Sequence, residues 1–222
     1  MKTDLPDDQF RSTFVCMRPK KKSSIRFMLV GRATNGWGDK ENDYEYLPRE
    51  KEQFSKKAQD LFEDPNRWGW IPEDFKIPYQ EDGVDKIYNI NRSPFWNYTK
   101  EVYECISESS SERWFESIAW SNLYKVSPSK GNPSVKSLRL QKDICSRILD
   151  YEIEKLNPTH ILFETGLDWV FESIIMNGKE CNNGHVEWVG TYKDAKCVIS
   201  CRPEYRKRDK FVGDIVEAFK RT

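Results

Sequence analysis

The chain has few of the residues that build metal sites, and it has no long apolar run. Its 222 residues include two His and six Cys, and no two Cys form a Cys-x-x-Cys pair. This spacing argues against a zinc site, so we expect neither a metal nor a cofactor. No run comes near the roughly 20 apolar residues that cross a bilayer. Because the start is polar and acidic, we also expect no signal peptide. We therefore expect a cytoplasmic protein with reduced thiols and no membrane contact.

Net charge is also absent, because 36 Lys and Arg are balanced by 36 Asp and Glu. The whole chain therefore lacks the positive field typical of nucleic-acid-binding proteins, and only a local patch could supply one. Aromatic residues are abundant, at 14% of the chain, and can fill a sizeable core. The length suits a single domain, with a monomer as the default expectation.

Short apolar runs that end at polar loops are the main feature of the sequence. Such near-continuous runs are typical of strands that are buried on both faces. We expect them at 25–30, 118–123, 160–163 and 196–200, with a further short strand near 186–191. In open α/β sheets, ligands bind at the carboxyl ends of the strands. We therefore expect the loops 31–38, 164–166 and 201–203 to meet at one site.

Helical patterns alternate with these runs. The spacing of apolar residues and the capping residues predict helices at 51–62, from Ser93 onward, at 134–156, 168–176 and 209–219. In the helix over 134–156, Leu140, Ile144, Ile148 and Tyr151 share one face. The alternation predicts an α/β fold, a three-layer α/β/α sandwich with a mainly parallel central sheet of about four or five strands.

The chain divides into two parts in this interpretation. Residues 1–23 are expected to be a loosely ordered N-terminal arm, with a short helix around Asp7–Phe14 and a basic tail at 20–22. Residues 24–222 are expected to form the α/β domain. Within it, 38–92 is an aromatic-rich insertion, and its stretch 66–72 is either a lid over a site or a plug on the core.

The order and spacing of the loops resemble those of the uracil-DNA glycosylase superfamily. The residues that carry the resemblance lie in 29–37, 121–133, 157–166 and 201–205. It covers roughly residues 24–220 and implies a uracil-DNA glycosylase-like fold. It also implies a DNA or nucleotide partner and a pocket for a flipped base, whose N-glycosidic bond the protein would hydrolyse.

The resemblance also implies roles for particular residues. The base would be bound by Gly31, Arg32, Ala33, Trp37, Asn122 and Tyr205. Phosphates would be bound by Arg206, Lys207 and Arg208. The family carries a His in the last loop, where this chain has Cys201 and Arg202. Arg202 would therefore stabilise the departing base, and Asn35 would orient the attacking water.

Several alternatives stay open. The chain could be a non-catalytic binding module of the same fold, since it lacks the family's His and an Asp in the first loop. It could be an unrelated hydrolase or transferase whose nucleophile is Cys201, with Arg202 lowering the thiol pKa. The carboxylates after the first loop could activate a water or could be solvated charges; they are Asp39, Glu41, Asp43 and Glu45.

Overall fold

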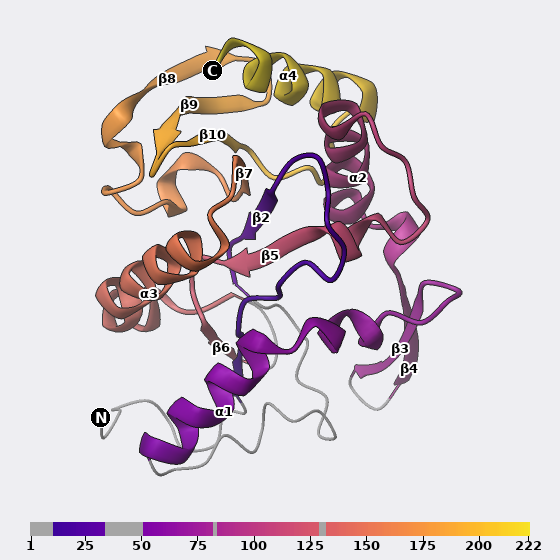
Figure 1. Ribbon diagram of the computed structural model, residues 1–222, viewed down its shortest axis with the longest axis vertical. Coiled ribbons are helices and arrows are strands. Elements are labelled where there is room, and N and C mark those ends of the chain that lie inside the picture. Colours follow the sequence, from indigo (N-terminus) through magenta and orange to yellow (C-terminus); the bar gives the residue numbers. More distant parts are fainter. Residues whose placement is uncertain (1–10, 34–50, 82–83, 129–131) are drawn as a thin grey trace.

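A six-stranded sheet forms the centre of the molecule (Figure 1). The computed structural model describes residues 11–33, 51–81, 84–128 and 132–222. The strand order is β5-β2-β7-β10-β9-β8. The strands are β2 (Phe27–Gly31), β5 (Ile118–Asn122), β7 (His160–Glu164), β8 (Gly178–Asn183), β9 (Val186–Tyr192) and β10 (Ala195–Ser200). The first four strands in this order are parallel, while β9 and β8 are antiparallel. The α/β class and the mainly parallel sheet are confirmed, with six strands rather than four or five.

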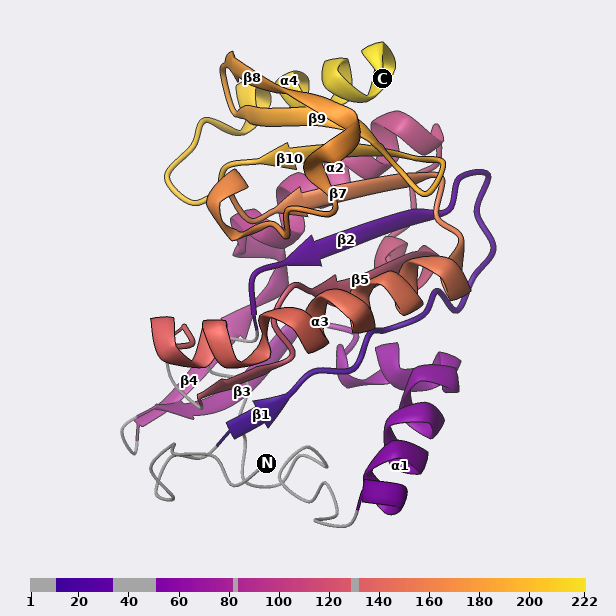
Figure 2. The same cartoon turned by 90° about the vertical axis from the view of Figure 1, so that its left-hand side faces the viewer.

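Helices cover both faces of this sheet. Figure 2 shows α3 (Val135–Leu156) on the near face, with α2 (Pro94–Ser107) and α4 (Arg208–Arg221) behind the sheet. Neighbouring residues of a strand point to opposite faces. Accordingly, Leu29 belongs to the core cluster under α2 and α4, whereas Met28 and Val30 belong to the cluster under α3. Burial on both sides explains why the strand sequences are apolar throughout.

The helix α3 turns a different face to the core from the apolar stripe seen in its sequence. Its buried residues include Cys145, Leu149 and Ile153, while Leu140 and Ile144 of the stripe are about half exposed, at 46% and 49%. The helix ends are as expected. Ser134 accepts a hydrogen bond from the backbone of Ser137, and Asn157 ends the helix in the left-handed conformation.

The described part of the N-terminal segment is not a loose arm. Strand β1 (Arg11–Thr13) pairs with β6 (Val126–Pro128), so no helix extends to Phe14. Phe14 and Met17 are buried, and Met17 exchanges backbone hydrogen bonds with Trp120. Lys20 and Lys21 donate backbone hydrogen bonds to the carbonyl of Glu116. These residues are ordered because the aromatic core next to β5 gives their apolar side chains a place to pack.

One part of the aromatic insertion packs into the core, and another part lines a cavity. Its elements are α1 (Lys51–Glu63), the 3₁₀ helix η1 (Pro65–Trp70), the hairpin of β3 (Lys76–Glu81) and β4 (Val84–Asn89), and the 3₁₀ helix η2 (Ile90–Arg92). Trp68 is fully buried against Trp96 and Trp120, and its indole N–H donates to the Arg18 carbonyl at 2.8 Å. The stretch 66–72 is therefore part of the core and does not act as a lid, and the hairpin lines the cavity that is described in the next section.

Two further segments form short 3₁₀ helices. One of them, η3 (Trp114–Ser117), leads into β5. The expected helix over 168–176 is absent, because only the 3₁₀ turns η4 (Leu167–Trp169) and η5 (Ile175–Asn177) form there. Aromatic and β-branched residues such as Trp169 and Val170 disfavour a helix. Burial of Phe171 and Ile174 under the sheet determines the path of this segment instead.

Within the described ranges, none of the helices combines the length and the apolar character that crossing a membrane requires. The same part of the chain holds no group of three His, Cys, Asp or Glu side chains placed to bind a metal ion. All six cysteines are free thiols.

A buried ion pair connects α3 to the end of β5. Lys125 Nζ lies 2.7 Å from Glu152 Oε2, and both side chains are almost completely buried. The hydroxyl of Ser121 lies between them, donating to Glu152 at 2.7 Å and accepting from Lys125 at 2.6 Å. Removing one member of such a pair leaves an uncompensated buried charge, whereas removing both does not.

We therefore expect Lys125→Met to lower the free energy of unfolding by about 3–5 kcal/mol in urea denaturation. The double variant Lys125→Met/Glu152→Leu should be considerably more stable than the single one. Lys142→Met is the control, because it breaks an exposed pair with Glu172 (3.2 Å) and should cost about 0–1 kcal/mol. A single variant as stable as the double variant would contradict this account.

Candidate functional site

A cavity of about 700 Å³ opens at the carboxyl edge of the parallel strands. Each of the four parallel strands contributes a residue at or just after its end: Gly31 from β2, Asn122 from β5, Glu164 from β7 and Arg202 from the loop after β10. The volume lies within the range of small-molecule sites, roughly 300–1,000 Å³.

The structure brings five of the expected site residues to this one cavity, namely Gly31, Arg32, Ala33, Asn122 and Arg202. Tyr205, Arg206, Lys207 and Arg208 are not among its lining residues and are exposed. Asn35 and Trp37 lie outside the described residues, as do the carboxylates at 39–45. The roles expected for all of these residues stay predictions.

Gly31 and Asn122 pack so closely that position 31 has no room for a side chain. The two residues are direct partners in the parallel register of β2 and β5. A Cβ atom at position 31 would lie 2.4 Å from Asn122 Oδ1 and 3.6 Å from the ring of Phe95. The glycine therefore allows the Asn122 amide to lie across the end of β2.

Glu164 is the most unusual group of the cavity, because this carboxyl side chain is only 2% exposed. Thr99 of α2 donates a hydrogen bond to Glu164 Oε1 at 2.8 Å. Oε2 is buried and has no hydrogen-bond partner among the described residues. Burial raises the pKa of Glu164 well above its ordinary range; Glu204 adds to this rise, while Thr99 and Arg202 oppose it. The raised pKa favours the neutral carboxylic acid over the ionised carboxylate at this position.

The amide of Asn122 is equally buried, at 2% exposure. Its Nδ2 atom likewise has no hydrogen-bond partner in the part of the chain that the structure describes. Most buried polar side-chain atoms in proteins do have a partner, because an unmet one costs about 1–3 kcal/mol. Two such atoms in one cavity are therefore available to a ligand that could bond with both.

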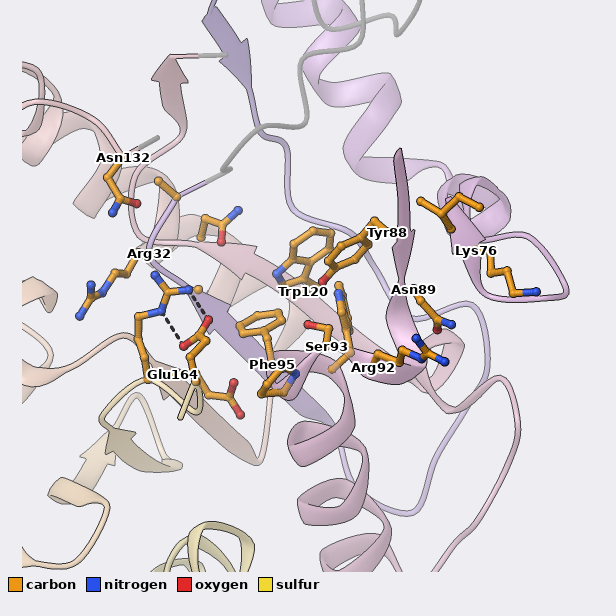
Figure 3. A pocket seen from close by; sticks show the side chains of 18 residues that line it. Arg32, Lys76, Tyr88, Asn89, Arg92, Ser93, Phe95, Trp120, Asn132 and Glu164 are labelled. Atoms are coloured by element: carbon orange, nitrogen blue, oxygen red, sulfur yellow. Dashed lines mark hydrogen bonds and ion pairs between the residues drawn. The ribbon is translucent and has the colours of Figure 1, made fainter. Parts of the chain in front are cut away.

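Aromatic side chains occupy the middle of the cavity. Figure 3 shows Phe95, Tyr88 and Trp120 between two polar ends. Glu164 and Arg32 lie at one end of the view, and Lys76 and Arg92 lie at the other, on the side of the β3–β4 hairpin. A flat ligand could therefore contact aromatic rings while its two ends meet groups of different chemistry.

Arg32 and Arg202, which lie at the Glu164 end of the cavity, both make hydrogen bonds with other groups of the protein. Arg202 donates to both carboxylate oxygens of Glu204, with Nε 3.0 Å from Oε2. Arg32 donates to the Thr165 carbonyl, and its guanidinium lies 4.6 Å from the ring centroid of Trp169. Burial, together with the charge of Arg202, lowers the pKa of Arg32. These contacts hold both cations at the cavity, and Glu204 partly compensates the charge of Arg202.

The segment 205–208 after β10 does not lie at the cavity, where it was expected to bind phosphates. Tyr205 is completely exposed with a left-handed backbone (φ 64°), and the carbonyl of Arg206 accepts a hydrogen bond from Tyr98. Arg208 is ion-paired with Glu101. This part of the loop packs against α2 and does not reach the lining of the cavity.

The structure does not support a nucleophilic Cys201. Burial raises the pKa of the Cys201 thiol, whereas a reactive thiolate needs a lowered one. Arg202 makes its ion pair with Glu204 instead, and Cys201 is not among the residues that line the cavity. The expectation that Arg202 activates this thiol was therefore wrong.

Sequence reasoning expected the loop 164–166 at the site but gave Glu164 no role, although this residue ends a strand that is otherwise apolar. Several other residues that line the cavity were not assigned. Phe95 follows the recognisable Ser93-Pro94 helix start. Lys76, Tyr88 and Arg92 come from the hairpin and the turn after it, and no local pattern connects them to the ends of the strands.

No family model and no curated protein matches this chain. The resemblance to the uracil-DNA glycosylase superfamily therefore stays a prediction.

We expect Gly31→Ala to lower the free energy of unfolding by about 1–3 kcal/mol, because its Cβ would displace the Asn122 amide. Shortening the partner in Gly31→Ala/Asn122→Ala should recover part of this loss. Gly213→Ala is the control; it enters open space on α4 and should be stabilising by about 0.5–1 kcal/mol. Urea denaturation measures all three variants. If Gly31→Ala is as stable as the parent protein, the close approach of Asn122 does not exclude a side chain at position 31.

Proposed function

We propose that the cavity binds a single nucleobase, presented by a nucleic-acid strand or a nucleotide. The observation that carries this proposal is the pair of unmet polar groups, Glu164 Oε2 and Asn122 Nδ2, in a cavity with aromatic walls. A nucleobase has the matching chemistry: a flat aromatic face that stacks on rings such as Phe95, and an edge of hydrogen-bonding atoms. A purely apolar ligand would leave both buried groups without partners.

The other end of the cavity supports a phosphate-bearing ligand. Lys76 and Arg92 are cationic side chains on the hairpin side, and Figure 3 shows them at the opposite end of the view from Glu164. Cations at such a place bind the backbone of a strand and contribute affinity without reading sequence. This local pair brings positive charge to the cavity of a chain that is neutral as a whole, and the exposed Asp74, 3.8 Å from Lys76 Nζ, compensates part of it.

Hydrolysis of the N-glycosidic bond is a second candidate function, which the neutral acid Glu164 favours. In this reaction water adds to the sugar carbon, the bond to the base breaks, and the base leaves with a proton. A protonated carboxyl beside the base can supply that proton, and the carboxylate that remains takes up the proton that the water loses. The two-point contact of Arg202 with Glu204 favours the binding module instead, because it partly neutralises the charge expected to stabilise the departing base.

Oligonucleotides with one uracil, one hypoxanthine or one thymine–guanine mismatch distinguish these functions. We expect binding above that of an unmodified strand in fluorescence anisotropy. Phe95→Ala should weaken this binding about tenfold or more, because one base–aromatic stack is worth about 1–3 kcal/mol. Phe62→Ala on α1, which packs against Tyr151 instead, is the matched control.

Cleavage of the same strands in alkali detects abasic product. Binding with abasic product supports hydrolysis, and binding without it supports the module. Equal binding of all strands, unaffected by Phe95→Ala, would contradict a nucleobase site.

The cationic pair makes a separate prediction about salt. If Lys76 and Arg92 each neutralise one phosphate, Lys76→Ala/Arg92→Ala should reduce the slope of log affinity against log salt by about 1.4 for a single strand. The control variant Lys220→Ala/Arg147→Ala removes the same two residue types from exposed positions outside the cavity. An unchanged slope in the first variant would show that phosphates bind elsewhere.

A further inference from the structure

The side of α3 that faces away from the sheet carries exposed apolar residues. Among the described residues, large hydrophobic side chains with high exposure are more numerous on this helix than on any other element. Leu140, Ile144 and Tyr151 are about half exposed, and Ile148 is partly exposed. We call these four residues the α3 stripe. Figure 2 shows the helix on the near side of the molecule with no other ribbon in front of it, so the stripe is open to a partner.

The spacing of the α3 stripe is typical of a contact between two helices. Its residues follow one another at steps of four, four and three positions, close to the 3.5-residue repeat with which helices pack along their length. The opposite side of α3, with Leu149 and Ile153, is already buried. At one end the stripe continues onto α1, where the ring centroids of Phe62 and Tyr151 are 6.2 Å apart. The stripe therefore offers a second helix a continuous apolar surface.

The charges along one flank of the stripe are self-complementary. This flank carries exposed residues of both signs, because a helix turns by about 100° per residue: Lys136, Asp143, Arg147 and Glu154. Asp143 and Arg147 lie two positions before and after Cys145, and Lys136 and Glu154 lie nine positions before and after it. In an antiparallel pair of α3 helices with a two-fold axis at this level, Asp143 would face Arg147 of the second copy. Lys136 would likewise face Glu154. A parallel pair would bring like charges together instead.

We propose that the α3 stripe binds a second copy of this chain, with the two α3 helices antiparallel about a two-fold axis. The apolar residues of each copy then cover those of the other, and the charged flanks meet with opposite signs. An unrelated partner would need the matching order of charges in its own sequence, whereas a second copy supplies it by symmetry. The proposal departs from the monomer expected by default. None of the residues involved lines the cavity, so it does not depend on the proposed function.

The size of this surface predicts a weak dimer. The 22 residues of α3 form a helix about 33 Å long. One pair of helices of this length buries less than the roughly 800 Å² per partner of a standard interface. Exposed ion pairs add little affinity, and Glu154 also lies 2.5 Å from Lys193 Nζ of its own chain. We therefore expect a dimer that forms reversibly and only at high protein concentration, with Asp143 and Arg147 as its better charge pair.

Sedimentation equilibrium from about 1 μM to about 1 mM protein tests the dimer. We expect the mean mass of the parent protein to rise from that of one chain toward that of two. Ile144→Glu should leave a monomer throughout, because it would bury an unpaired charge in the middle of the interface. Val135→Glu is the matched control and should dimerise as the parent protein does. Val135 is on the same helix and is 64% exposed, but it points about 140° away from Leu140.

Reversing charges tests the antiparallel arrangement. Asp143→Arg brings arginines together across the axis, and Arg147→Asp brings aspartates together. Each variant should weaken the dimer about tenfold, because the two-fold axis makes every substitution count twice. A one-to-one mixture of the two variants should dimerise again, since each Arg of one chain then faces an Asp of the other. No effect within a single helix can produce this recovery.

Urea midpoints at low protein concentration should be close to that of the parent protein for all variants, which shows that a lost dimer is not a lost fold. A parent protein that stays monomeric up to about 1 mM would overturn the proposal. A dimer that Ile144→Glu leaves intact, or that Val135→Glu also removes, would overturn the assignment to the α3 stripe. If mixing the two charge variants restores nothing, the antiparallel arrangement is wrong.

Discussion

The parallel pairing of β5, β2, β7 and β10 determines where every polar group of the cavity floor lies. Parallel strands end on the same edge of a sheet, so the residues after them are brought together however far apart they are in the sequence. Gly31, Asn122, Glu164 and Arg202 are neighbours for this reason. The strand interiors are apolar and buried by helices on both faces, and Glu164 at the end of β7 is buried as well. This burial favours the neutral form of Glu164.

The strands and their common edge could be predicted from the sequence because they depend on local patterns. Runs such as 25–30 and 196–200 are apolar throughout, and a loop with polar residues follows each of them. Those two facts suffice to expect Gly31 and Arg202 at one site, whereas Asn122 was expected there only from the family resemblance; all three residues line the cavity.

Other features could not be predicted because they depend on contacts between distant segments. The burial of Trp68 depends on the Arg18 carbonyl and on Trp120, which no local pattern connects. The same holds for the hairpin that provides Lys76 and Tyr88 to the cavity. In α3, the apolar stripe with Leu140 and Ile144 was visible, but the core prefers the face with Leu149 and Ile153. Both faces of α3 are partly apolar, and packing against the sheet determines which of them is buried.

The position of β2 in the middle of the parallel strands has a consequence for synthesis of the chain. This strand is made early, yet it pairs with β5 and β7, and the cavity at its end also needs Arg202 from beyond β10. Contacts between residues so distant form late and slowly. On the ribosome, the backbone N–H and C=O groups that β2 pairs with β7 would therefore stay without these partners until β7 has been made, and the cavity would be completed only after Arg202 has followed.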